Sequence, residues 1–325
     1  MPRILRSMCL IAFAIVSTPL WTATANAAAV RDGSAVKSGF VTTPDGVKIH
    51  YVESGHTKVG MRGAVANPAP GDAIVTKGDA SLEPSHRFPS ILFVPGWTMP
   101  GWIWEKQVDY FSDDWRVVAM DPRSQGDSSK NATDFSPAAR ARDIKAVIEH
   151  LRLAPVIIVG WSMGVTDIAS YVNQFGTHSL AGIVFVDGLA GYDQVPPWVQ
   201  GFVEMLKTDR QKQADLFVRG MFHKPQSEDY LARLSKASFQ MPTNAAVESF
   251  TGIWSTDNRG AFAKIDKPTL IIVTRSSLMP NYEQMQKAIR GARLEIFEGD
   301  GHALFVDDSD RFNGTLEDFI FDLNQ

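Results

Sequence analysis

The chain has 325 residues, of which 44% are hydrophobic and 21% charged, and its formal net charge is −4. The apolar fraction is too high, and the charge too balanced, for a disordered chain. The sequence has no long basic run, which argues against a dedicated nucleic-acid binder. It also has no run of about 18 apolar residues, the length that a membrane-spanning helix needs.

The first stretch has the three parts of a secretory signal peptide. Arg3 and Arg6 precede a short apolar run over residues 8–16, and small residues follow with Ala25-Asn26-Ala27 as an A-x-A site. The alternative is an uncleaved membrane anchor, which the shortness of the run and Pro19 disfavour. We therefore expect cleavage after the A-x-A site and a secreted or periplasmic protein.

Cleavage would define the mature chain as residues 28–325, a single domain of 298 residues. Because two arginines leave with residues 1–27, the net charge would change from −4 to −6. The only cysteine, Cys9, leaves as well, so the mature chain would have neither a thiol nor a disulfide. This excludes a cysteine nucleophile and cysteine-bound metal, and about 300 residues suffice for a stable core without disulfides. We expect no cofactor and no metal.

The beginning of the mature chain predicts a hairpin followed by an insertion. Residues 39–43 and 48–53 alternate in polarity around Pro44-Asp45-Gly46, as the two strands of a hairpin do. Residues 57–89 are rich in glycine and proline and show no periodicity, so they predict an irregular insertion. A loop of this length is either functional or loosely ordered.

The rest of the chain alternates between strands and helices. Helical segments are predicted at 136–151 and 164–175, and continuous apolar runs, typical of strands buried on both faces of a parallel sheet, lie at 91–94, 116–120, 156–159, 182–186, 269–274 and 294–297. With the hairpin this predicts an α/β fold with a mostly parallel central sheet of about eight strands flanked by helices. Residues 188–267 carry amphipathic pieces without a clear strand, which we interpret as a helical cap.

The sharpest motif is Gly160-Trp161-Ser162-Met163-Gly164. It follows a predicted strand and opens a predicted helix, the context of the nucleophile elbow, in which a tight turn exposes the serine hydroxyl. The alternative is an ordinary glycine-rich turn with a capping serine. A serine needs a general base, and among the seven histidines His302 is the one that follows the last strand, in a glycine-containing loop.

These motifs, in this order, resemble those of the α/β-hydrolase fold family. Residues 121–128, Asp-Pro-Arg-Ser-Gln-Gly-Asp-Ser, resemble the family's D-x-R-G-x-G-x-S loop, with Ser124 where glycine is usual. The segment 93–97 resembles the family's strand-end His-Gly-x segment, with Pro95 in place of histidine. The resemblance implies an oxyanion hole formed by the backbone N–H groups of Trp97 and Met163. Backbone donors require no particular side chain, so Pro95 leaves that expectation intact.

The third member of the expected catalytic triad departs from the family pattern. The resemblance places an acid after the strand 269–274, but Ser277 stands there. Some family members carry the acid one strand earlier, where this chain has Asp187. We predict Asp187 as the acid, with its carboxylate within about 3 Å of His302. Glu283 is the second candidate, and Asp300 is too close to His302 along the chain to reach round it.

The resemblance implies an exported serine hydrolase that cleaves a carboxylic ester, lactone, thioester or amide through an acyl-enzyme on Ser162. A nucleophilic serine argues against epoxide hydrolysis and dehalogenation, which need an aspartate at the elbow.

Tryptophans and methionines near the motifs predict either an apolar or aromatic acyl pocket or simple core packing. A non-catalytic ligand-binding protein on the same fold is the alternative, supported by Ser277. The substrate, the oligomeric state and the order of the insertion stay open. In this fold the insertion would lie at the sheet end opposite the nucleophile, so we expect its deletion to affect catalysis little.

Overall fold

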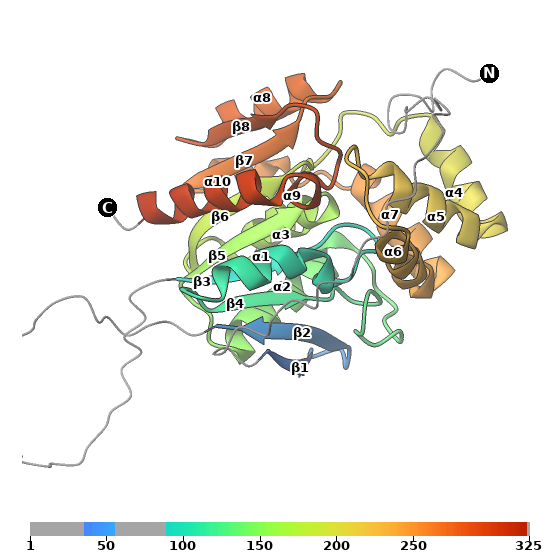
Figure 1. The fold of residues 1–325 in the computed structure, drawn as a ribbon, viewed down its shortest axis with the longest axis horizontal. Helices are drawn as coiled ribbons and strands as arrows, with labels where there is room; N and C mark the ends of the chain where they lie inside the picture. Colours follow the sequence, from blue (N-terminus) through green and yellow to red (C-terminus); the bar gives the residue numbers. More distant parts are fainter. Residues whose placement is uncertain (1–35, 56–88, 324–325) are drawn as a thin grey trace, which may run out of the picture.

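The computed structural model describes residues 36–55 and 89–323. The predicted signal peptide, 1–27, and the predicted insertion, apart from Pro89, lie outside the described residues. The described part is an α/β structure with the helices packed on both faces of one sheet and gathered at one of its ends (Figure 1).

The sheet has eight strands in the order β1-β2-β4-β3-β5-β6-β7-β8. Only the first two pairings, β1 with β2 and β2 with β4, are antiparallel, and all the others are parallel. The prediction of a mostly parallel sheet is therefore confirmed. The strands are β1 (Lys37–Thr42), β2 (Lys48–Ser54), β3 (Ser90–Val94), β4 (Val117–Met120), β5 (Val156–Trp161), β6 (Leu180–Val186), β7 (Thr269–Thr274) and β8 (Arg293–Phe297).

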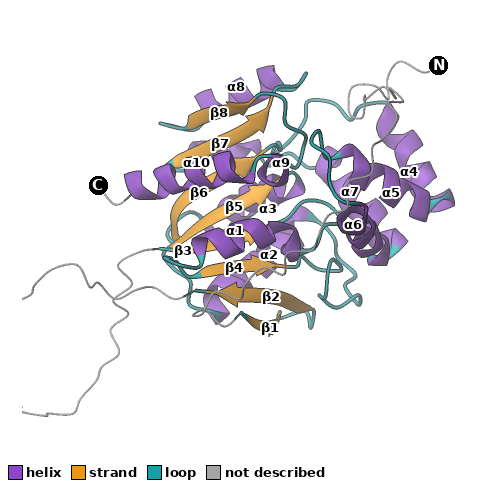
Figure 2. Ribbon diagram, viewed as in Figure 1, coloured by secondary structure: helices purple, strands orange, loops and turns teal. Residues whose placement is uncertain are grey.

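Successive residues of the central strands face opposite sides, and this alternation divides the core into two clusters. One face of the sheet packs against α2 (Pro137–His150), α3 (Met163–Phe175) and α8 (Met279–Ala288). The other packs against α1 (Glu105–Phe111), α9 (Leu304–Asp307) and α10 (Ser309–Asp322) (Figure 2). All residues of β3, β4, β5 and β7 are buried, as their unbroken apolar runs predict.

Residues 188–267 contain no strand and lie beyond the carboxyl ends of the parallel strands (Figure 1). Their four α-helices form the region that we call the cap. These helices are α4 (Trp198–Thr208), α5 (Arg210–Gly220), α6 (Glu228–Gln240) and α7 (Thr243–Ser255). The 3-10 helix Arg259–Lys264 then returns the chain to α3 before β7 begins. No helix of the described residues is both long and apolar enough to cross a membrane.

Two buried ion pairs lie on one face of the sheet, one between the 121–128 loop and α2 and the other between α2 and α3. Arg123 donates to both carboxylate oxygens of Asp143 at 2.7 Å. Arg140 of α2 donates to both carboxylate oxygens of Asp167 in α3 at 2.8 and 2.9 Å. Burial raises the pKa of the Asp167 carboxyl to about 6, while the Arg140 charge opposes that shift. Each guanidinium therefore has its counter-charge within the same layer.

Candidate active site

Ser162 lies on a sharp turn between the end of β5 and the start of α3. Its backbone has φ 56° and ψ −115°, a left-handed conformation that is rare for a residue with a side chain. The Ser162 N–H donates to Val186 O at 2.9 Å, which fastens the turn to β6. The side chain is half-buried, so it lies at the border of the core. This is the strained strand-to-helix turn that the sequence motif predicts.

The turn is possible because the glycines around it allow close backbone approaches. A β-carbon at Gly160 would lie 2.4 Å from Ile168 Cδ1 and 2.7 Å from Gly164 O. A β-carbon at Gly164 would lie 2.7 Å from Val94 O. All three distances are below normal contact, so Gly160 is needed for the strand end to pack against α3 and Gly164 for α3 to pack against β3.

The loop after β8 brings His302 to the hydroxyl of Ser162. His302 Nε2 lies 2.9 Å from Ser162 Oγ, and His302 Nδ1 lies 2.6 Å from Asp187 Oδ2. Ser162, His302 and Asp187 thus form a continuous hydrogen-bonded chain at the carboxyl ends of three different strands. The Asp187 side chain is buried, whereas 29% of the His302 side chain is exposed to solvent. The imidazole is therefore partly accessible, whereas the carboxylate that orients it is not.

The second oxygen of Asp187 is also held by hydrogen bonds. Asp187 Oδ1 accepts from the Thr274 backbone N–H at 3.1 Å, from the Thr274 hydroxyl at 3.3 Å and from the Tyr282 hydroxyl at 3.1 Å. Burial, with the charge of Asp187 as a smaller cause, raises the pKa of the Tyr282 hydroxyl well above its usual value. Tyr282 is therefore protonated at neutral pH and acts as a donor. Three donors to one oxygen fix the orientation of the Asp187 carboxylate.

The other acids considered from the sequence lie elsewhere. Glu283 is exposed on α8, and no described contact joins it to His302. Asp300 is buried and pairs with Lys224 of the cap at 3.0 Å. Ser277, which stands where the family pattern has its acid, is exposed. Because β6 and β7 are neighbouring parallel strands, an acid at the end of β6 reaches the same point of the sheet edge.

The two backbone amides predicted for the oxyanion hole border Ser162. Met163 is the first residue of α3, and its N–H is one of the helix donors that lack an intrahelical acceptor. On the opposite side, a β-carbon at Gly96 would lie 3.0 Å from Ser162 Cβ, so the 96–97 peptide passes directly beside the serine. Gly96 and Met163 thus both adjoin Ser162, where the sequence predicts the oxyanion hole.

A buried glutamine holds the oxyanion segment in place. Gln125 Nε2 donates to Gly96 O at 3.0 Å and to Met99 O at 2.7 Å, and Gln125 Oε1 accepts from the Thr98 N–H at 3.1 Å. Thr98 has φ 61°, so this segment is a strained turn that needs such support. The sequence showed only that Gln125 belongs to the 121–128 loop. Its partners are 26 to 29 residues away, and no local pattern points to them.

The tryptophan of the elbow anchors the histidine loop. Trp161 Nε1 donates to His302 O at 2.8 Å, and the two rings lie 5.1 Å apart between centroids. The cap holds the same loop from the other side, where Asp307 Oδ2 accepts from the N–H groups of Gly301 at 2.7 Å and His223 at 2.8 Å. The backbone of His302 is therefore fixed by both the sheet and the cap.

Aromatic side chains connect the oxyanion segment to the cap. Trp97 is buried, its Nε1 donates to Ala246 O at 2.9 Å, and its ring packs against Phe202, Phe217 and Phe250 with centroids 5.0 to 5.8 Å apart. The aromatic contacts here are packing contacts, and the acyl pocket stays a prediction. Trp104, which stacks on Phe305 in the core, is a packing residue, whereas Trp97 lies between the site and the cap.

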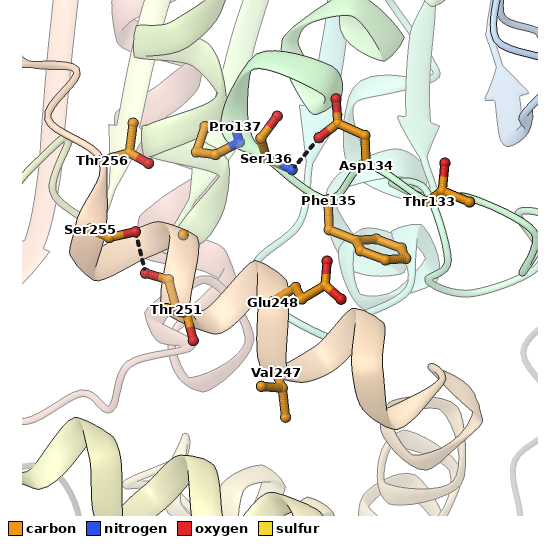
Figure 3. Close-up of a pocket in the computed structure, with 11 residues that line it drawn as sticks. Thr133, Asp134, Phe135, Ser136, Pro137, Val247, Glu248, Thr251, Ser255 and Thr256 are labelled. Atoms are coloured by element: carbon orange, nitrogen blue, oxygen red, sulfur yellow. Dashed lines mark hydrogen bonds between the residues drawn. The ribbon is translucent and has the colours of Figure 1, made fainter.

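One hollow of the described surface lies away from Ser162. It has a volume of about 480 Å³ and lies between the segment 133–137 and one side of α7 (Figure 3). It is lined mainly by hydroxyl groups, one glutamate and one aspartate, and none of the residues of the Ser162 site belongs to it.

One group of side chains has ligand types suited to a metal ion. The ligand atoms of His50, Asp121 and Asp127 lie within 4.8 Å of one another. The Asp121 oxygens, however, already accept from the N–H groups of Gly101 and Asp127 and contact His50 Nδ1 at 2.7 Å. We interpret this group as a hydrogen-bonded support of the 121–128 loop.

Comparisons with known proteins agree with this architecture. Residues 89–309 match the family model described as alpha/beta hydrolase fold. The chain is 26% identical over 250 residues to a non-heme haloperoxidase from Rhodococcus erythropolis, covering 71% of this chain and 91% of that protein. It is 24% identical over 308 residues to a bifunctional esterase/perhydrolase from Acinetobacter calcoaceticus, covering 87% and 99%. An esterase from Exiguobacterium antarcticum shares the fold, with a TM-score of 0.72 at 22% identity over 86% of this chain and 98% of that chain.

Proposed function

Because the chain belongs to the α/β-hydrolase fold family, we propose that it is a serine hydrolase that cleaves a carboxylic ester through an acyl-enzyme on Ser162. The observation that carries this proposal is the hydrogen-bonded chain from Ser162 Oγ through both nitrogens of His302 to Asp187. A nucleophile, a base within 2.9 Å and an acid that orients the base are the elements of the serine triad.

The geometry assigns each group a step. Ser162 Oγ attacks the ester carbonyl carbon while its proton passes to His302 Nε2. The carbonyl oxygen becomes an oxyanion between the N–H groups of Trp97 and Met163, and each such donor contributes roughly 2.7–4 kcal/mol to the transition state. His302 then protonates the leaving alcohol, and the acyl-enzyme is hydrolysed by water through the same steps. Asp187 keeps the proton on Nδ1 and stabilises the imidazolium.

The central test is Ser162→Ala, with reaction of the native protein toward a fluorophosphonate. We expect the substitution to abolish ester turnover and labelling while the unfolding temperature changes little, because the hydroxyl serves chemistry at the border of the core. Ser277→Ala, at an exposed serine, is the matched control and should retain both. Turnover within a few fold of wild type in Ser162→Ala would refute a serine mechanism.

The same labelling separates this function from a ligand-binding protein without catalysis. A binding protein on this fold would not need a serine that reacts with an organophosphorus probe. The presence of Ser162 and His302 at 2.9 Å supports the enzyme. Absence of labelling together with saturable ligand binding would favour the non-catalytic alternative.

We further propose an apolar or aromatic acyl group as part of the substrate, because Trp97 and three cap phenylalanines lie next to the oxyanion segment. Lactones, thioesters and amides can be cleaved by the same acyl-enzyme steps. A screen of esters of graded chain length, lactones and aminoacyl amides would rank these classes. A preference for short polar acyl groups would contradict the apolar pocket.

A second candidate activity is perhydrolysis, in which hydrogen peroxide replaces water in attack on the acyl-enzyme and releases a peracid. It is favoured by two relatives whose names are non-heme haloperoxidase and bifunctional esterase/perhydrolase. The test is peracid formation from an ester and hydrogen peroxide, with Ser162→Ala as the control. We expect this as a side activity of the esterase.

Export is the remaining part of the proposal, and its support is the sequence of residues 1–27 alone. N-terminal sequencing of the protein from cells should find the mature chain beginning at or near Ala28. An intact Met1 on exported protein would contradict cleavage.

A further inference from the structure

The cap contains a buried arginine without a counter-charge. Arg210 begins α5, and only 8% of the residue is exposed. One of its N–H groups, on Nη2, donates to Ser238 O at 2.7 Å. Its Nε and Nη1 atoms are buried and have no hydrogen-bond partner, and no carboxylate of the described residues pairs with it.

This guanidinium lies directly above the oxyanion segment. Its Cζ atom is 5.9 Å from the centroid of the Trp97 ring, and the 96–97 peptide passes beside Ser162. The same buried layer continues from Ser238, whose hydroxyl donates to Thr98 Oγ1 at 2.8 Å. Arg210 thus belongs to the roof that the cap places over the carboxyl end of β3.

The hydrogen bond that Arg210 donates to Ser238 of α6 does not by itself explain why this residue is an arginine. A single hydrogen bond to Ser238 O uses one of five N–H donors, and a neutral side chain could supply it. Burial lowers the pKa of the Arg210 guanidinium to about 10, so it is still protonated at neutral pH. A buried cation costs free energy unless an anion joins it. The unused donors on Nε and Nη1 indicate where that anion would bind.

We propose that Arg210 binds a carboxylate of the substrate, so that the preferred ester carries a second, free carboxylate, as in a half-ester of a dicarboxylic acid. This rests on the proposed ester hydrolysis at Ser162 and narrows its substrate class. A carboxylate can accept a charge-assisted hydrogen bond from the free Nε–H or the free Nη1–H group, and Trp97 connects Arg210 to the oxyanion segment. Because Nε and Nη1 are shielded from solvent here, the carboxylate reaches them when the cap helices part.

The test compares two methyl esters of equal length, which differ only in charge. Monomethyl succinate, glutarate and adipate are each assayed against the corresponding ester in which the free acid is a primary amide. We expect wild-type kcat/KM for the acid to exceed that for the amide at one chain length at least. In Arg210→Met the acid-to-amide ratio should fall by roughly 10- to 100-fold, the value of a lost charged hydrogen bond.

Two further variants control for charge and structure. Arg219→Met removes an exposed arginine of the same helix, one that pairs with Asp215 and Glu228, and should leave the ratio unchanged. Arg210→Lys keeps the charge without the planar group and should give an intermediate ratio. A fall of both esters by the same factor in Arg210→Met, or no acid preference at any length in wild type, overturns the inference.

If Arg210→Met hydrolyses both esters too slowly for kinetics, a binding measurement tests the same inference. In the Ser162→Ala background, the monomethyl half-ester should raise the unfolding temperature, and adding Arg210→Met should remove that increase. Equal increases in both proteins would also overturn the inference. Failure of the proposed function looks different, because then no ester is hydrolysed and no fluorophosphonate label is incorporated.

Discussion

Buried arginines differ between two regions of the molecule, the cap and the sheet with its flanking helices, which we call the sheet layer. In the sheet layer, the buried guanidinium groups of Arg123 and Arg140 each contact both oxygens of a buried aspartate. In the cap, the buried guanidinium of Arg210 has one carbonyl partner and two nitrogen atoms without any. The buried arginines of the sheet layer are neutralised without a ligand, whereas Arg210 of the cap has no carboxylate paired with it.

This difference separates two tasks. The sheet layer holds Ser162, His302 and Asp187 at fixed distances, and its ion pairs keep the supporting helices in register. The cap covers the oxyanion segment and contains the unneutralised charge, so it is the part suited to selecting a substrate. The two regions should therefore respond differently to the loss of a charged side chain.

The largest effect is expected from removing the charge of Asp187. Asp187→Asn should lower kcat by about 10⁴-fold, because the amide can neither stabilise the imidazolium nor hold the tautomer of His302 that accepts from Ser162. Steady-state kinetics would measure it, with Glu283→Gln, on the exposed face of α8, retaining near wild-type activity. The opposite ranking of the two variants would transfer the acid role to Glu283.

The largest effect on folding is expected at the ion pair between α2 and α3. Asp167→Asn leaves the buried Arg140 guanidinium without its counter-charge and should lower the free energy of unfolding by about 3–5 kcal/mol. Urea denaturation would measure it. Asp215→Asn, which breaks an exposed pair with Arg219, should change stability by less than about 1 kcal/mol. Equal losses in the two variants would mean that burial of the pair is unimportant.

Urea denaturation of an Arg210 variant should show a change in the free energy of unfolding of the opposite sign. Arg210→Met removes a buried cation that has no counter-charge, so the free energy of unfolding should rise by about 1–2 kcal/mol in the absence of substrate. A variant that is more stable but prefers anionic esters less would mean that Arg210 lowers stability and contributes to substrate selection. A destabilisation comparable to that of Asp167→Asn would instead make Arg210 a structural residue and remove the contrast between the two regions.

The smallest expected effect is a pH dependence of the free energy of unfolding that comes from His50 in β2. The hydrogen bond that the His50 imidazole donates to the Asp121 carboxylate raises the pKa of His50, although burial opposes the shift. A raised pKa stabilises the folded state below the unfolded pKa, near 6.5, and this contribution is lost as the pH rises through the folded value. The stability difference between wild type and His50→Gln should therefore shrink from pH 6 to pH 9, with exposed His178→Gln as the control. A difference that grows over this range would contradict the shift.

Local patterns in the sequence were sufficient for the architecture. All eight predicted strands and the two clearest helices are present, with ends that differ by one or two residues, because apolar runs, a capping Ser136 and flanking glycines act over short distances. The elbow was recognisable for the same reason. Its strand, its glycines and its helix are adjacent in the chain, and Ser162 adopts the left-handed backbone that they predict.

The sequence by itself determined the chemical types available, namely one serine on an elbow, one histidine after the last strand and several candidate acids. Only the tertiary structure decided which acid meets His302, and it did so because β6 and β7 are neighbours and their carboxyl ends converge. It also revealed the partners of that acid, Thr274 and Tyr282, which lie 87 and 95 residues away along the chain. The missing counter-charge of Arg210 belongs to this second class, since a charge is recognised as unpaired only when every neighbour in space is known.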